Sequence, residues 1–182
     1  MARSSGSRTS RSNLGGASAG GNLTAGVAKR LSMERQAVPA SLLLVYPLVH
    51  AVPPPPSGDL LLALRERGMA SGAHDVLIQA ATAHFAGAAS VEDEIAFAAN
   101  GAVPEGHPAT FIYNADADGL RASGEAYATK LAQAGVDATV ETLPGSTHGF
   151  LNEPESAAGR AGVDRLERWL KRAGDESPAR FA

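Results

Sequence analysis

One short motif, Gly16-Ala17-Ser18-Ala19-Gly20, constrains the fold of this chain more than any other feature. A helix-forming sequence follows it directly, and a G-x-S-x-G motif in that setting is typical of a nucleophile elbow. In such an elbow a serine sits on a sharp, strained turn between a strand and a helix. We expect side chains at Gly16 and Gly20 to collide with the neighbouring strand and helix, which would require glycine at both positions. The backbone N–H of Ala19 is then the expected donor to an oxyanion.

The sequence in front of this motif lacks the buried strand that an elbow needs. Residues 1–13 contain five serines, three arginines and no acidic residue. They predict a disordered basic tail, with a transit peptide as the alternative. Only Leu14 stands where an apolar run is expected. Behind the motif, Leu23, Val27 and Leu31 recur at four-residue spacing and predict a helix.

The rest of the chain alternates between short apolar runs and helical patterns. Such alternation implies an α/β fold, with a mostly parallel sheet and helices on both faces. Residues 52–107, which carry four consecutive prolines near their start, form a cap-like excursion long enough to cover a site. The predicted domain spans residues 14–175. Its expected strands are 41–47, 108–114 and 136–143, and its expected helices are 59–67, 73–86, 123–134 and a last one capped by Ser156 that ends near Gly174.

Composition excludes several classes of protein. The 182 residues fit one domain, and the absence of cysteine excludes a thiol nucleophile, a disulfide framework and a cysteine-liganded metal. A net charge of −3 gives no reason to expect a nucleic acid partner. No apolar run is long enough to span a bilayer, and the N-terminus lacks the apolar core of a secretory signal, so a cytoplasmic protein is predicted. Residues 15–21 fit neither a P-loop nor a dinucleotide-binding motif.

Three kinds of chemically active side chain follow the predicted strands in the order Ser, Asp, His. Functional residues of doubly wound sheets lie at the carboxyl ends of strands, where Ser18, Asp116, Asp118 and His148 are expected. A histidine can take the serine proton and return it to the leaving group. A carboxylate fixes the imidazole tautomer and stabilises the imidazolium. The pattern therefore favours a nucleophilic serine hydrolase over a plain glycine-rich turn.

The sequence separates the candidate histidines more clearly than the candidate aspartates. His148 alone follows the final predicted strand, whereas the other histidines precede loops or strands or lie in predicted helices; these are His50, His74, His84 and His107. Asp116 and Asp118 are equally placed, and either can cap the helix that starts near Ser123. A calcium loop is the other reading of this acidic run, but the later bidentate Glu of an EF-hand is absent.

Several segments together resemble the hormone-sensitive-lipase-like branch of the α/β-hydrolases, the fold-3 esterases. They are the elbow with Gly21-Asn22-Leu23, the strand 42–47 with Leu48-Val49-His50, Asp118-Gly119-Leu120-Arg121, Gly124-Glu125-Ala126-Tyr127 and His148-Gly149-Phe150. The resemblance covers about residues 14–172. It implies an α/β-hydrolase fold and a carboxylesterase of short acyl esters that uses neither a cofactor nor a metal.

The resemblance also implies a role for each site residue. Ser18 is the nucleophile, and His148, which precedes Gly-Phe as in the family, is the base. The family acid lies two residues before a Leu-Arg pair, which selects Asp118 over Asp116. Two departures are small: Ala17 replaces the usual acid of the elbow, and Gly119 replaces a common proline.

One departure from the family is larger. The family carries an upstream His-Gly-Gly-Gly loop that supplies oxyanion-hole amides, and this sequence has no such motif. We therefore expect the C-terminal portion of a larger hydrolase, without the N-terminal strands, and little activity from the chain as given, because these oxyanion donors are missing. The expected partner is a small-molecule ester, and an exposed sheet edge offers a route to a homo-oligomer. The alternatives are a non-catalytic remnant of the fold, or a peptide or thioester hydrolase with the same triad.

Overall fold

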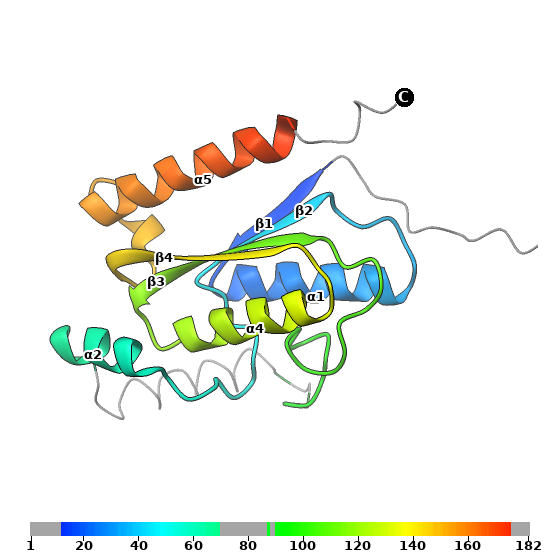
Figure 1. Cartoon of the computed structure of the whole chain (residues 1–182), viewed down its shortest axis with the longest axis horizontal. Coiled ribbons are helices and arrows are strands. Elements are labelled where there is room, and N and C mark those ends of the chain that lie inside the picture. The colour runs from blue at the N-terminus through cyan, green and yellow to red at the C-terminus, as the bar shows by residue number, and fades with distance from the viewer. Residues whose placement is uncertain (1–11, 70–86, 88–89, 176–182) are drawn as a thin grey trace, which may run out of the picture.

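The computed structural model describes residues 12–69, 87 and 90–175 (Figure 1). The helix predicted over 73–86, with His74 and His84, lies outside these residues. In chain order the described elements are β1 (Asn13–Ala17), α1 (Ala19–Met33), β2 (Ser41–Val45), α2 (Gly58–Glu66), β3 (Ala109–Ala117), α4 (Arg121–Gln133), β4 (Ala138–Thr147), the 3₁₀ turn η1 (Phe150–Asn152) and α5 (Ala157–Asp175).

The described strands form one parallel sheet in the order β1-β2-β3-β4. Helices α1 and α4 cover one face and α5 covers the other, as Figure 1 shows. The predicted α/β class, with a parallel sheet between two helical layers, is confirmed. The predicted strands 41–47, 108–114 and 136–143 correspond to β2, β3 and β4.

The core consists of two apolar layers, one on each face of the sheet. Side chains of a strand alternate between the faces. Leu44 and Ile112 therefore point toward α1 and α4, whereas Phe111 and Tyr113 point toward α5 and Trp169. Because both faces of the sheet are covered, β2 reads as a continuous apolar run rather than an alternating one.

A strand does precede the elbow, contrary to the expectation from the sequence. Strand β1 pairs with β2 along its length, from Asn13 opposite Ser41 to Ala17 opposite Val45. The Ser41 hydroxyl also donates to Asn13 Oδ1 at 2.7 Å. Backbone pairing rather than side-chain burial holds this half-buried edge strand, and hydrophobic periodicity does not register such pairing. Asn13, assigned above to the tail, is thus the first residue of β1.

Helix α1 forms as predicted, but its predicted apolar stripe faces outward. Leu23 is 60% exposed and Val27 is 48% exposed, whereas Ala25 and Ala28 are fully buried. Small side chains allow the helix backbone to approach the sheet closely. Lys29 is buried on this face and forms an ion pair with Glu94 at 3.1 Å.

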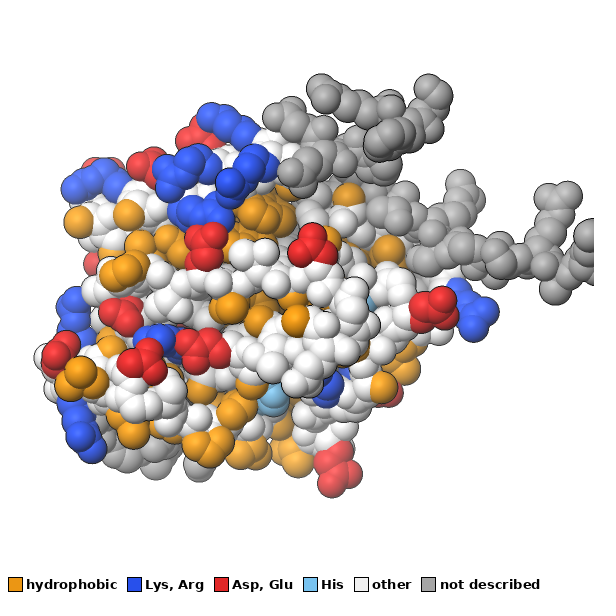
Figure 2. Space-filling view, viewed as in Figure 1, with side chains coloured by type: hydrophobic (Ala, Val, Ile, Leu, Met, Phe, Trp, Pro, Cys, Tyr) orange, Lys and Arg blue, Asp and Glu red, His pale blue; other side chains and the backbone are white. Residues whose placement is uncertain are grey.

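Helix α5 begins as its sequence predicts, although two of its apolar side chains, Val163 and Leu170, are about half exposed. The Ser156 hydroxyl accepts a hydrogen bond from the Gly159 N–H at 2.9 Å, which caps the helix. Leu166 and Trp169 pack on the sheet, and Figure 2 shows basic side chains gathered over the outer side of α5. Across the part of the chain described here, no helix combines the length and the apolar character needed to cross a membrane.

Candidate active site

The turn between β1 and α1 has the strained geometry of an elbow. Ser18, between the last residue of β1 and the first of α1, has φ 54° and ψ −119°. A positive φ is uncommon for a residue other than glycine, and such strain costs of order 1–3 kcal/mol. The Ser18 N–H donates to the Val45 carbonyl at 2.9 Å, which ties the turn to β2.

Two neighbouring glycines, and not the pair predicted, make this turn possible. A Cβ on Gly16 would lie 2.2 Å from the Gly20 carbonyl oxygen, so the expected collision at Gly16 is confirmed. The expected collision at Gly20 is wrong, because a Cβ there would meet open space. Gly21 is the crowded position instead, since its Cβ would lie 3.0 Å from Pro47 Cβ.

The three residues singled out in the sequence form one hydrogen-bonded chain. Ser18 Oγ lies 2.9 Å from His148 Nε2, and His148 Nδ1 lies 2.7 Å from Asp118 Oδ2. A carboxylate only accepts, so Nδ1 donates to it, and Nε2 of the neutral imidazole is left to accept from the serine hydroxyl. The fold thus unites a turn after β1 with residues that follow β3 and β4.

The surroundings of His148 set its affinity for a proton. Burial lowers the pKa of His148, but the hydrogen bond to Asp118 and the charge of that carboxylate raise it, and the net pKa lies above the usual 6.5. Asp118 is only 1% exposed, so water screens this charge weakly. The pair therefore stabilises an imidazolium, which a general base becomes after it takes a proton.

Both carboxylate oxygens of Asp118 have partners, although its side chain does not cap α4. Its Oδ1 accepts from the Leu120 N–H at 3.0 Å, which orders the turn before α4, while its Oδ2 contacts His148. Asp116 lies inside β3 and contacts other partners, described below. The remaining described histidines also lie elsewhere: His50 contacts Ser123 at 2.8 Å, and His107 contacts Tyr127 at 3.2 Å.

Tyr46 is a site residue that the sequence reasoning missed. It follows β2 directly, with φ 35°. Its ring centroid lies 4.8 Å from that of His148 and 5.0 Å from that of Phe150, so the phenol ring forms a wall against the imidazole. The available signal was the position of Tyr46 between a buried strand and Pro47.

The start of α1 suits a developing negative charge. Ala19 is the first residue of the helix, where backbone N–H groups have no acceptor within the helix and the helix dipole is positive. This position suits the Ala19 N–H as the oxyanion donor that the motif predicts. Within residues 12–69, 87 and 90–175, no three His, Asp or Glu side chains come together as metal ligands.

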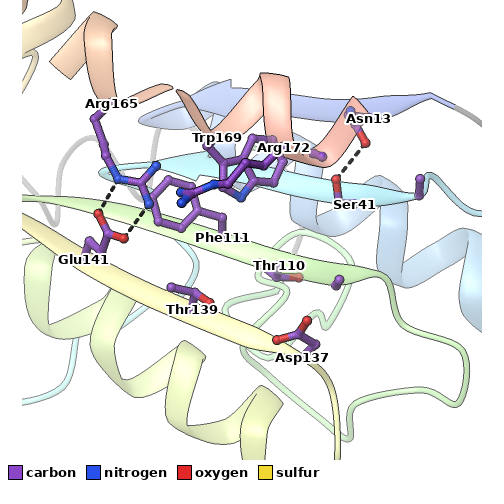
Figure 3. A pocket seen from close by; sticks show the side chains of 13 residues that line it. Asn13, Ser41, Thr110, Phe111, Asp137, Thr139, Glu141, Arg165, Trp169 and Arg172 are labelled. Atoms are coloured by element: carbon purple, nitrogen blue, oxygen red, sulfur yellow. Dashed lines mark hydrogen bonds and ion pairs between the residues drawn. The ribbon is translucent and has the colours of Figure 1, made fainter. Parts of the chain in front are cut away.

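A cavity of about 610 Å³ lies at the opposite end of the strands, beneath the C-terminal half of α5 (Figure 3). None of the three hydrogen-bonded residues lines it. Its lining includes residues at or near the starts of the strands together with side chains of α5, namely Asn13, Ser41, Thr110, Asp137, Thr139, Glu141, Arg165, Trp169 and Arg172. This cavity is therefore separate from the candidate active site.

Comparison with known proteins agrees with this geometry. A family model described as alpha/beta hydrolase fold matches residues 2–152. The chain belongs to this family. A comparison with curated proteins finds no match in sequence.

Several esterases of known structure share the fold of this chain. Carboxyl esterase 2 from Tuber melanosporum aligns with a TM-score of 0.76 at 23% identity, over 90% of this chain and 54% of its own. An esterase from Pyrobaculum calidifontis aligns with a TM-score of 0.70 at 26% identity, over 87% of this chain and 51% of its own. An esterase from the bacterial hormone-sensitive lipase family aligns with a TM-score of 0.75 at 20% identity, over 89% of this chain and 53% of its own. The predicted resemblance to that family is confirmed, and the chain spans about half the length of these relatives.

Proposed function

We propose that the protein is a serine hydrolase that cleaves short-chain carboxylic esters. The observation that carries this proposal is the hydrogen-bonded chain from Ser18 through His148 to Asp118, at a strained elbow. Structural relatives named as esterases support the same reaction class. The proposed substrate is a small-molecule ester, and the reaction needs no cofactor.

In the proposed reaction Ser18 Oγ attacks the ester carbonyl carbon while its proton passes to His148 Nε2. Asp118 holds the imidazole in the required tautomer and stabilises the imidazolium. The carbonyl oxygen becomes an oxyanion, to which the Ala19 N–H donates. The C–O bond to the alcohol then breaks, and His148 returns its proton to the departing alcohol oxygen. Water repeats the sequence on the acyl-serine and releases the carboxylic acid.

A panel of p-nitrophenyl esters of increasing acyl length, assayed with purified chain, tests the proposal. We expect whatever turnover of the short esters the wild type shows to be absent from Ser18→Ala, because Ser18 Oγ is the attacking atom. Matching circular dichroism spectra would show that the variant folds. Equal hydrolysis by wild type and variant would contradict the proposal. Turnover of peptides or thioesters in preference to esters would instead support the alternative substrate class.

A further inference from the structure

Strand β4 departs from regular pairing just before it delivers His148. Ala115 of β3 pairs with Leu143, but two residues later Ala117 pairs with Thr147. Four steps along β4 thus match two along β3, and residues 144–146 form a bulge, called here the β4 bulge. Bulges next to active sites re-aim side chains.

This bulge determines which residue of β4 lies beside the catalytic carboxylate. With regular pairing from Ala115–Leu143 onward, Asp118 would lie opposite Ser146. The two extra residues in β4 bring Thr147 opposite Ala117, so that His148 comes next to Asp118. The 2.7 Å contact between them therefore depends on the bulge keeping its shape.

Asp116, directly across from the bulge, holds it by both backbone and side chain. Its Oδ2 accepts from the Gly145 N–H at 2.8 Å. Its own N–H donates to Ser146 Oγ at 3.2 Å, and that buried hydroxyl donates to the Leu143 carbonyl at 2.7 Å. Gly145 has φ 70°, so the bulge needs its left-handed backbone as well.

Two arginines complete this arrangement. Arg67, which follows α2, donates to the Gly145 carbonyl. The N–H of Gly145 is therefore bonded to Asp116 and its carbonyl to Arg67. Arg121, on α4, donates to Asp116 Oδ1 at 3.1 Å and to Glu125 at 2.8 Å, and it also pairs with Asp59 of α2. Each carboxylate oxygen of Asp116 therefore has its own donor.

We propose that Asp116 is a positioning residue that acts through the β4 bulge to keep His148 within hydrogen-bond distance of Asp118. The inference rests on the proposed function for its kinetic consequence, but its structural content is independent of it. Asparagine cannot replace the carboxylate, because its NH₂ would face either the Arg121 guanidinium or the Gly145 N–H. Alanine removes both acceptors.

The test uses the full chain as wild type and as Asp116→Asn, Asp116→Ala and Arg67→Gln. Glu141→Gln is the matched control, because Glu141 is also a strand carboxylate paired with a helical arginine, but its carboxylate contacts Arg165 of α5 rather than the bulge. We measure kcat and KM on a short ester, the melting temperature, and the downfield proton NMR signal of His148 Nδ1–H. This signal reports the contact with Asp118 directly.

We expect Asp116→Ala to lower kcat on the order of 10²-fold, as a misplaced catalytic group does, with little change in KM. The decrease in kcat should be smaller in Asp116→Asn than in Asp118→Asn, and smaller still in Arg67→Gln. The downfield signal should weaken in the same order. Glu141→Gln should lower the melting temperature but keep kcat and the signal.

Wild-type kcat and signal in Asp116→Ala would overturn the inference, as would an equal loss in Glu141→Gln. If Asp116→Ala does not fold, Arg67→Gln decides by the same readouts. If the wild type hydrolyses no ester, the proposed function fails, but the NMR signal still decides the positioning role. A signal that is present in the wild type and lost in the Asp116 variants supports the positioning role. A signal that is unchanged in these variants, or absent from the wild type, contradicts it.

Discussion

The two ends of the sheet differ in how their polar side chains are connected. The carboxyl end combines positive φ at Ser18 and Tyr46 with a buried carboxylate at Asp118. The amino end holds a cavity of about 610 Å³ with many polar side chains in its wall, and there the Trp169 ring stacks on that of Phe111 with centroids 5.6 Å apart (Figure 3). The comparison teaches that, in this fold, a continuous hydrogen-bonded chain such as Ser18–His148–Asp118 indicates the candidate active site better than a cavity with polar walls does.

The charged pairs at the two ends differ in what they can do with a proton. Asp118 contacts a histidine, which changes its protonation state near neutral pH. Glu141 contacts Arg165, whose guanidinium stays protonated at any pH at which the protein folds. Only the carboxyl-end pair can therefore move a proton to and from a substrate.

The largest expected difference separates these two carboxylates. Asp118→Asn should lower kcat by up to about 10⁴-fold, because the imidazole loses the partner that fixes its tautomer. Glu141→Gln should leave kcat unchanged and lower the free energy of unfolding by about 1 kcal/mol, since its side chain is 38% exposed. Steady-state kinetics and urea denaturation measure the two quantities. Similar kcat losses in both variants would remove the distinction between the two ends.

A smaller effect separates the two glycines of the elbow motif. Gly16→Ala should lower stability by about 1–3 kcal/mol and reduce turnover, because its Cβ would meet the backbone of Gly20. Gly20→Ala should raise stability by about 0.5–1 kcal/mol, since the space is open and alanine favours a helix. Urea denaturation gives both values. Equal destabilisation by the two substitutions would show that the turn has another geometry.

The smallest predicted effect is the displacement of the pH profile. His148 must be neutral to accept a proton, and its pKa is raised above 6.5. kcat/KM should therefore fall as the pH drops through a value above 6.5. In Asp118→Asn, burial still lowers the pKa of His148 but no carboxylate raises it. The residual activity should therefore fall at a lower pH than in the wild type. A flat wild-type profile between about pH 5 and 9 would argue against a histidine base.

The sequence predicted best what depends on local motifs and chain order. Ser18 and His148 could be chosen because parallel strands bring their carboxyl ends to one edge of the sheet. The choice of Asp118 over Asp116 rested on the resemblance to the family. Their catalytic roles are proposals that the variants above test. The tail predicted over 1–13 stays a prediction for the residues outside the described part of the chain. The cap-like role of 52–107, a cytoplasmic location and a homo-oligomer also stay predictions.

The sequence predicted least where backbone pairing or tight packing decides. Strand β1 was missed because backbone hydrogen bonds to β2 hold it rather than apolar side chains. The buried face of α1 was misjudged because its contacts are made by small residues such as Ala25 and Ala28. The β4 bulge depends on register between two strands, which the pattern within either strand does not encode.

The most direct test of the central claim is mass-spectrometric mapping of the chain after reaction with a fluorophosphonate. Only a serine activated by a neighbouring base should displace fluoride and form a phosphonyl ester at an appreciable rate. We predict one modified residue, Ser18, with labelling lost in Ser18→Ala and strongly slowed in His148→Ala. An unlabelled wild-type chain, or a label on another serine, would contradict the assignment of Ser18 as the nucleophile.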